Sequence, residues 1–254
     1  MLPTPSTAPR TPSETGAPVL AQAKLCRSES FGSLSYIVCS FDLTKDDLRT
    51  FWRGPDGKPY RTFAAVAADL QSKGRSLQFA MNGGMYEDDF SPVGLYIENG
   101  RELTPTSIAR LTGPPSQIPN FYKKPNGVFY IGDGEAGILE TERFLADRPK
   151  ANFATQSGPM LLIDGTIHPA FIVNSTDRTL RNGVCVTSRT QVHFVLTKGW
   201  VNFHDFALFF RDSLSCRNAL FLDGGAAPGL YAPELGRNDA PGHGGYGPII
   251  AVVE

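Results

Sequence analysis

Three Asn-Gly or Asp-Gly pairs, each between two apolar segments, constrain the fold of this chain more than any other feature. The pairs are Asn99-Gly100, Asp133-Gly134 and Asp164-Gly165. Asn-Gly and Asp-Gly readily supply the two positive-φ positions of a type I′ turn, the preferred connection of a two-residue β-hairpin. The pairs therefore predict three hairpins, whose first strands span residues 93–98, 128–132 and 160–163.

Further strands and helices follow from hydrophobic patterning. A fourth hairpin joins residues 184–187 to 191–196, and apolar or alternating segments predict strands at 34–41, 48–52, 77–81, 219–222 and 248–253. Apolar side chains at helical spacing predict a helix that begins after Thr62 and ends before Gly74, and another that begins near Asn202. A short helix is expected over 141–146. The prediction is an α+β fold: one curved, largely antiparallel sheet of successive hairpins with a few packed helices.

The domain organisation is predicted to be simple. Residues 1–24 are rich in Pro, Ser and Thr and predict a flexible lead-in, whereas 25–254 predict a single domain. A chain of 254 residues, 41% of them hydrophobic, can bury one sizeable core, and a net charge of −1 gives no bias toward nucleic acid or a membrane surface. No apolar run is long enough for a membrane span, and no signal peptide is visible. The sequence leaves the oligomeric state open.

The chain has four cysteines, which allow three fully paired connectivities. Cys26 and Cys39 flank a segment that could fold back as a hairpin, so they are the favoured pair in an oxidising compartment. The alternative is four free, buried thiols in a cytosolic protein. No pair has the CxxC spacing typical of a zinc site.

Two Gly-Gly breaks stand at predicted strand ends, Asn82-Gly83-Gly84 and Asp223-Gly224-Gly225. Adjacent glycines permit positive φ and let backbone amides approach a ligand closely, which suits an anion or a sugar. The alternative is a pair of independent tight turns. Since one break is led by Asn and the other by Asp, we expect them to form two walls of one site.

Catalytic motifs of several common enzyme classes are absent. The sequence contains no GxSxG, GxxxxGK[ST], HExxH or GxGxxG motif, and its four histidines are too scattered to predict a metal cluster. Carboxylates are the more promising groups, because glycoside cleavage commonly uses one to stabilise an oxocarbenium-like transition state or to direct water. Asp223 is the main candidate. Glu87 and its neighbours Asp88 and Asp89 are expected to form a solvated loop, to direct water, or to hold a divalent cation, the one cofactor left open.

Four short motifs occur in the order and spacing of the phosphodiester glycosidase family, and the chain resembles the compact bacterial branch of that family over about residues 34–254. The motifs begin at Asn82, Ser157, Arg181 and Leu222, and two further segments, NFxxKPNGVF from Asn120 and NFHDFA from Asn202, resemble the bacterial branch. The resemblance implies a hydrolase that cleaves the glycosidic bond of a sugar-1-phosphodiester, for example N-acetylglucosamine linked through phosphate. It also implies a sugar-phosphodiester or glycan partner and a periplasmic or secreted location in a bacterium.

The expected site combines residues carried over from the family motifs with charged residues nearby in the sequence. The catalytic candidates are Asp223, Glu87 and His204, where His204 is alternatively a surface group at a helix start. The substrate-binding candidates are Asn82, Gly83, Gly84, Lys124, Asn126, Ser157, Gly158, Arg178, Arg181, Gly224 and Gly225. Asn82 and Ser157 would orient the sugar, and Arg181 or Arg178 would hold the phosphate with the Gly-Gly amides.

The chain departs from the family pattern after the second Gly-Gly break. The family usually continues with Gly-Ser, whereas this chain has Ala226-Ala227 and so loses a hydroxyl and a flexible position. This difference supports an alternative function, a catalytically inactive module of the same fold that binds carbohydrate or an envelope polymer.

Overall fold

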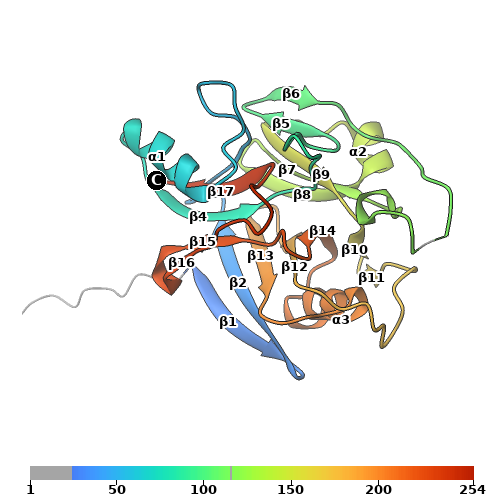
Figure 1. The fold of residues 1–254 in the computed structure, drawn as a ribbon. Helices are drawn as coiled ribbons and strands as arrows, with labels where there is room; N and C mark the ends of the chain where they lie inside the picture. The colour runs from blue at the N-terminus through green and yellow to red at the C-terminus, as the bar shows by residue number, and fades with distance from the viewer. Residues whose placement is uncertain (1–24, 115) are drawn as a thin grey trace, which may run out of the picture.

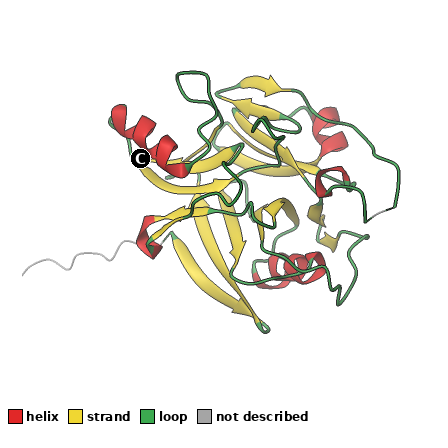
Figure 2. Cartoon of the chain, viewed as in Figure 1, coloured by secondary structure: helices red, strands yellow, loops and turns green. Residues whose placement is uncertain are grey.

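The strands of the chain form three sheets that enclose a common core and carry the helices on their outer sides (Figures 1 and 2). This computed structural model describes residues 25–114 and 116–254, so the predicted lead-in at 1–24 lies outside the described residues. The α+β class with largely antiparallel pairing is confirmed. The hairpins do not share one sheet, however. Seventeen strands exceed the roughly ten that a twisted open sheet usually holds, and they are divided among three sheets.

The first sheet has seven strands in the order β1-β2-β13-β12-β14-β10-β11. Its strands are β1 (Cys26–Phe31), β2 (Leu34–Asp42), β10 (Met160–Ile163), β11 (Thr166–Ile167), β12 (Arg181–Val186), β13 (Gln191–Thr197) and β14 (Asn218–Gly224). β12 and β14 pair with a register shift between Asn182 and Gly183, so a bulge lies beside the end of β14. Bulges redirect side chains and are common next to functional sites.

The other two sheets have five strands each, in the orders β16-β15-β4-β17-β3 and β6-β5-β9-β7-β8. The second sheet contains β3 (Asp47–Phe51), β4 (Leu77–Asn82), β15 (Leu230–Ala232), β16 (Arg237–Asn238) and β17 (Ile249–Val253). The third contains β5 (Tyr96–Glu98), β6 (Arg101–Thr104), β7 (Gly127–Gly132), β8 (Glu135–Glu140) and β9 (Phe153–Ser157). The C-terminal strand β17, predicted at 248–253, pairs with both β3 and β4 and so lies inside this sheet.

The predicted hairpin turns and helix starts are confirmed. All six residues of the three Asn-Gly and Asp-Gly pairs have positive φ, as a type I′ turn requires. Thr62 and Asn202 cap helices as expected, since each side chain accepts a hydrogen bond from the amide three residues later. The helical segments are α1 (Phe63–Ser72), α2 (Thr141–Asp147), α3 (Phe203–Leu208), the 3₁₀ turns η1 (Asn120–Tyr122) and η3 (Pro233–Leu235), and the π-helical turn η2 (Phe209–Ser213).

Each α-helix packs its apolar face on one sheet (Figure 1). α1 packs against β4 and β17, α2 against the β7–β8 hairpin, and α3 against β10 and its neighbours. Within the described residues, no helix is long and apolar enough to cross a membrane.

A cluster of phenylalanine rings joins the three sheets at the centre of the molecule. Phe194 of the first sheet lies 5.2 Å from Phe79 of the second sheet and 5.9 Å from Phe129 of the third, measured between ring centroids. Phe41 also contacts Phe79, at 4.7 Å. All four rings are buried. Aromatic pairs at these separations stabilise a core beyond their buried area, so the relative placement of the sheets is well fixed.

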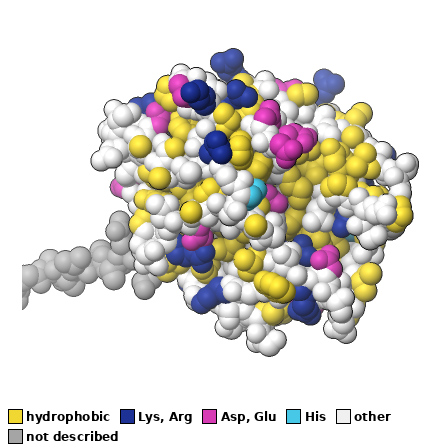
Figure 3. Space-filling view, in the orientation of Figure 1, with side chains coloured by type: hydrophobic (Ala, Val, Ile, Leu, Met, Phe, Trp, Pro, Cys, Tyr) yellow, Lys and Arg dark blue, Asp and Glu magenta, His cyan; other side chains and the backbone are white. Residues whose placement is uncertain are grey.

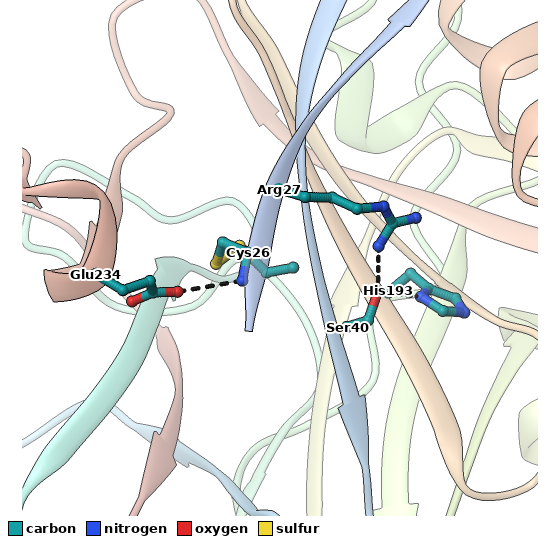
Figure 4. The surroundings of a disulfide bond; sticks show 6 residues. Cys26, Arg27, Ser40, His193 and Glu234 are labelled. Atoms are coloured by element: carbon teal, nitrogen blue, oxygen red, sulfur yellow. Dashed lines mark hydrogen bonds between the residues drawn. A yellow bond between two sulfur atoms is a disulfide. The ribbon is translucent and has the colours of Figure 1, made fainter. Parts of the chain in front are cut away.

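Two disulfides tie the first sheet together, and the favoured Cys26–Cys39 pair is one of them. It links β1 to β2, and Glu234 of η3 accepts a hydrogen bond from the Cys26 amide at 3.1 Å, which connects the first sheet to the second (Figure 4). On the same strands, Arg27 donates to Ser40 Oγ at 3.1 Å. The second bridge joins Cys185 of β12 to Cys216, just before β14.

Candidate active site

The three sheets meet where β4, β9 and β14 end, and the predicted residues Asn82, Ser157 and Asp223 stand at these three ends. Asn82 is buried, and its Oδ1 accepts hydrogen bonds from Asn182 Nδ2 at 2.7 Å and from the Gly229 amide at 2.9 Å. Asn182 Oδ1 in turn accepts from the Asp223 amide at 2.8 Å. Asn82 therefore positions the Asp223 backbone through Asn182, and its side chain does not line the open pocket.

Ser157 and Asn126 also support the site from within the protein. The buried Ser157 hydroxyl donates to the Leu222 carbonyl at 2.8 Å, immediately before Asp223. Asn126 donates to the Phe121 carbonyl at 2.9 Å and accepts from Lys124 Nζ at 2.8 Å, so it holds the loop that follows η1. Both side chains are placed to fix the shape of the site.

A cavity of about 530 Å³ opens above Asp223, and we call it the Asp223 pocket. Its polar wall consists of Tyr86, Glu87, Asp88, Asp223 and His243. Its apolar wall includes Met85, Phe90, Pro119, Phe121, Tyr122 and Ala227. In the space-filling view, hydrophobic and acidic side chains meet around a hollow beside a histidine (Figure 3). Aromatic walls with a few convergent polar groups are typical of a small-ligand site.

The Asp223 carboxyl has a strongly perturbed proton affinity. Part of its surface is open to the pocket, but protein atoms surround the rest, and this burial raises its pKa from 3.8 to about 7. The Gly224 amide donates to Oδ1 at 2.7 Å and offsets a smaller part of the rise. A carboxyl that titrates near neutral pH inside a pocket is suited to acid–base or nucleophilic chemistry.

Tyr86 and His243 form a hydrogen-bonded pair on the wall of the Asp223 pocket. The Tyr86 hydroxyl also lies 2.9 Å from the Gly245 carbonyl, to which it donates its single hydrogen, so His243 donates from Nε2 to the Tyr86 oxygen. Burial and the charge of Asp223 both raise the pKa of Tyr86, which keeps the phenol protonated. His243 was not among the predicted residues, because it lies in a glycine-rich tail without a motif.

The glycines of the two breaks act differently from the prediction. Positive φ occurs at Gly225 but not at Gly83 or Gly84. Gly84 is required for close packing: a Cβ there would lie 2.3 Å from the Gln156 carbonyl oxygen. Similarly, a Cβ on the predicted residue Gly158 would lie 2.5 Å from the Asn126 Cβ.

The amides expected to hold a phosphate are already engaged in the fold. Those of Gly83, Gly84 and Gly225 donate to Pro248 O, Thr155 Oγ1 and Leu180 O, and that of Gly224 donates to Asp223 itself.

The predicted cationic residues do not line the Asp223 pocket. Arg181 is 1% exposed, donates to the Val201 carbonyl at 2.9 Å and stacks on Phe203, with its guanidinium carbon 3.6 Å from the ring centroid. Burial lowers its pKa to about 10. Arg178 pairs with Asp205 at 3.0 Å. Lys124 and His204 line a second cavity, which is bordered by other residues of the segment 118–124 than those that line the Asp223 pocket.

The loop that carries Glu87, Asp88 and Asp89 is exposed to solvent. Glu87 and Asp88 line the Asp223 pocket, whereas Asp89 accepts from Ser91 Oγ and the Ser91 amide in a local turn. Across residues 25–114 and 116–254, no three His, Cys, Asp or Glu side chains converge in a metal-binding group.

Comparisons with known proteins agree with this architecture. The phosphodiester glycosidase family model matches residues 75–250, so the chain belongs to the phosphodiester glycosidase family. The uncharacterized protein YigE of Escherichia coli K12 is 36% identical over 177 residues, which cover 70% of this chain and 66% of YigE. The chain therefore spans slightly less than two thirds of that relative.

Solved structures with lower sequence identity show the same fold. The catalytic domain of zebrafish N-acetylglucosamine-1-phosphodiester alpha-N-acetylglucosaminidase, auto-inhibited by its pro-peptide, matches with a TM-score of 0.60 and 16% identity, over 89% of this chain and 81% of that chain. A protein of Burkholderia pseudomallei described as exported matches with a TM-score of 0.52 and 12% identity, over 86% of this chain and 74% of that one.

Proposed function

We propose that this protein hydrolyses the glycosidic bond of a sugar-1-phosphodiester and that Asp223 is its catalytic carboxylate. The observation that carries the proposal is a carboxyl with a pKa of about 7 at the base of an aromatic-walled pocket, in a chain of the phosphodiester glycosidase family. The sugar would lie in the Asp223 pocket, where Phe121 and Tyr122 offer apolar surface to its ring.

Ionised Asp223 would act on the anomeric carbon, either as a nucleophile or by directing water, because either role stabilises a developing oxocarbenium ion. The bond between the anomeric carbon and the phosphate oxygen breaks, and the leaving group is a phosphate monoester, a stable anion that needs little help from a general acid. Tyr86 and His243 would contact the sugar or its phosphate at the wall, and Glu87 at the rim would direct water. Asn82, Asn182 and Ser157 would hold Asp223 in place through the contacts described above.

The proposed location of the protein is outside the cytoplasm. An extracellular or periplasmic role on envelope glycans is supported by the two disulfides, which persist mainly in oxidising compartments, and by the similarity to an exported protein.

The test is sugar release from a panel of nucleotide-sugars and sugar-1-phosphodiesters, with a divalent cation and with a chelator, by the wild type and Asp223→Asn. Release by the wild type alone supports the proposal. Equal release by both proteins would remove Asp223 from the mechanism. Binding of a glycan without release, unchanged in the variant, would instead identify a carbohydrate-binding module, which Ala226 and Ala227 on the pocket wall favour.

A further inference from the structure

A second cavity, of about 560 Å³, borders the same segment 118–124 as the Asp223 pocket. We call it the His168 pocket, and its lining includes Lys123, Lys124, His168, Phe171, Phe203 and His204. The two cavities share this segment as a wall: Pro119, Phe121 and Tyr122 face one, and Ile118, Lys123 and Lys124 face the other.

A buried donor without an acceptor lines this second cavity. His168 is 2% exposed, and its Nδ1 accepts a hydrogen bond from the Ala170 amide at 3.1 Å. The neutral ring therefore carries its hydrogen on Nε2, and Nε2 forms no hydrogen bond of full geometry, although the Lys124 carbonyl lies close to the ring. Burial lowers the pKa of His168, an effect that the nearby Lys124 carbonyl partly offsets. Buried polar groups in proteins are normally paired, so an unpaired N–H at a cavity indicates a missing acceptor.

The other polar groups around the cavity favour a negatively charged acceptor. Lys123 Nζ donates to Asn120 Oδ1 at 2.8 Å, which leaves two of its three hydrogens for a ligand. Nδ1 of His204 is also buried and forms no hydrogen bond, but it lies 3.8 Å from Asp205 Oδ1 and so already faces a carboxylate. Asp177 is the one acidic side chain in the lining, and it is turned largely to solvent and lies 3.9 Å from Arg181. Two lysines therefore face one exposed carboxylate.

The rest of the cavity is apolar and partly open. Phe171 stacks on Phe203, with ring centroids 4.9 Å apart, and also on His168 at 4.8 Å. Ile172 beside them is 72% exposed. An apolar surface of this kind next to a donor and two lysines matches a ligand that has an anionic head and an apolar body.

We propose that the His168 pocket binds an anionic amphiphile, a phosphate group carried on an apolar chain. The phosphate accepts from His168 Nε2–H and Lys123, and the chain lies on Phe171, Phe203 and Ile172. Such a group is either the non-sugar end of the substrate itself or a separate phosphorylated lipid-like molecule. The first source rests on the proposed function. In that case the lysines of the His168 pocket would give the substrate a cationic contact that the Asp223 pocket lacks, since no Lys or Arg lines the Asp223 pocket among the described residues.

Calorimetric titration of the full chain with n-hexyl phosphate at pH 7 tests the site without requiring turnover. Hexyl phosphate should bind more tightly than inorganic phosphate by at least about tenfold, since each buried methylene contributes about 0.8 kcal/mol. Lys123→Gln and His168→Asn should each weaken binding about tenfold, as expected for loss of one charge-assisted or buried hydrogen bond. Asn at 168 retains an acceptor near the Nδ1 position while removing Nε2–H. Lys58→Gln is the matched control, because Lys58 is exposed and does not line the His168 pocket, and it should change binding less than twofold.

A kinetic comparison then separates the two sources. If KM for a sugar-1-phosphodiester with a hexyl end rises in Lys123→Gln in parallel with the dissociation constant of hexyl phosphate, the ligand is part of the substrate. If hexyl phosphate binding weakens while KM is unchanged, the ligand is a separate amphiphile. Both results support the site. The proposal is overturned if hexyl phosphate does not bind, or if the wild type and both folded variants bind it equally.

Discussion

Replacing Asp223 by Asn should stabilise the protein at alkaline pH while abolishing turnover. The substitution removes a charge but keeps an oxygen that can accept from the Gly224 amide, so the local hydrogen bond is retained. The folded-state pKa of about 7 lies roughly 3 units above the ordinary value of 3.8. At about 1.4 kcal/mol per unit, ionised Asp223 destabilises the folded state by up to about 4 kcal/mol. Because the side chain is partly accessible to solvent, we expect about 1–3 kcal/mol.

The pH dependence follows from the direction of the shift. Since the folded-state pKa is raised, the stabilising contribution of protonated Asp223 is complete below pH 3.8 and is lost as the pH rises through about 7. The Asn variant lacks this loss. Its advantage in the free energy of unfolding should therefore be near zero at pH 4 and reach about 1–3 kcal/mol at pH 8.

Urea unfolding of both proteins at pH 4 and pH 8, with the disulfides intact, measures this difference. Asp88→Asn is the matched control, because Asp88 is an exposed carboxylate on the same pocket, and it should change stability by less than about 0.5 kcal/mol at either pH. An equal change at both pH values for Asp223→Asn would refute the electrostatic reasoning. Retained turnover would refute the catalytic assignment independently.

Three further predictions concern Asp223 and the packing around the candidate site. In the wild type, kcat/KM should rise as the pH passes through about 7, because the ionised carboxylate is the active form; a pH–rate profile that falls over this range would assign Asp223 as an acid instead. Asn182→Ala should lower the free energy of unfolding by about 1–3 kcal/mol, since it unpairs the buried Asp223 amide and leaves Asn82 Oδ1 with the Gly229 amide alone, and should lower kcat more than it raises KM; an unchanged melting temperature would contradict this. Gly84→Ala should cost at least about 1–3 kcal/mol in denaturant unfolding, because its Cβ meets backbone that cannot move aside, whereas Gly100→Asn at an open, positive-φ turn position should cost less.

Local signals were sufficient to predict most elements but not their assembly. The Asn-Gly and Asp-Gly turns and the caps at Thr62 and Asn202 are decided by neighbouring residues, and they were found from sequence. Division into three sheets depends on long-range pairs, such as β17 with β3 and β4, that no local pattern encodes.

The same distinction holds at the site. Asp223 was predicted because a Gly-Gly break marks a strand end. His243 was missed, since only the tertiary fold brings it to Tyr86. Arg181 was expected at a phosphate, but it is buried against Phe203, a partner 22 residues further along the chain that its own sequence context does not reveal.

The energetics of Asp223 also bear on the choice between an enzyme and a binding module. A module that only holds glycans can use neutral hydrogen-bonding groups, and an Asn at position 223 would avoid the desolvation that raises the pKa of this carboxyl. The surroundings instead hold Asp223 rigidly. Asn182 Oδ1 accepts from the Asp223 backbone amide, the Ser157 hydroxyl donates to the Leu222 carbonyl, and the Gly224 amide donates to Asp223 Oδ1. The first and third sheets supply these contacts, and Asn82 of the second sheet binds Asn182, so all three sheets help to fix a group that lowers the stability of the fold at neutral pH. Strained or desolvated groups that are well supported in this way are characteristic of catalytic sites, where stability is exchanged for reactivity. This argument favours hydrolysis over binding alone, even though Ala226-Ala227 replaces the Gly-Ser usual in the family.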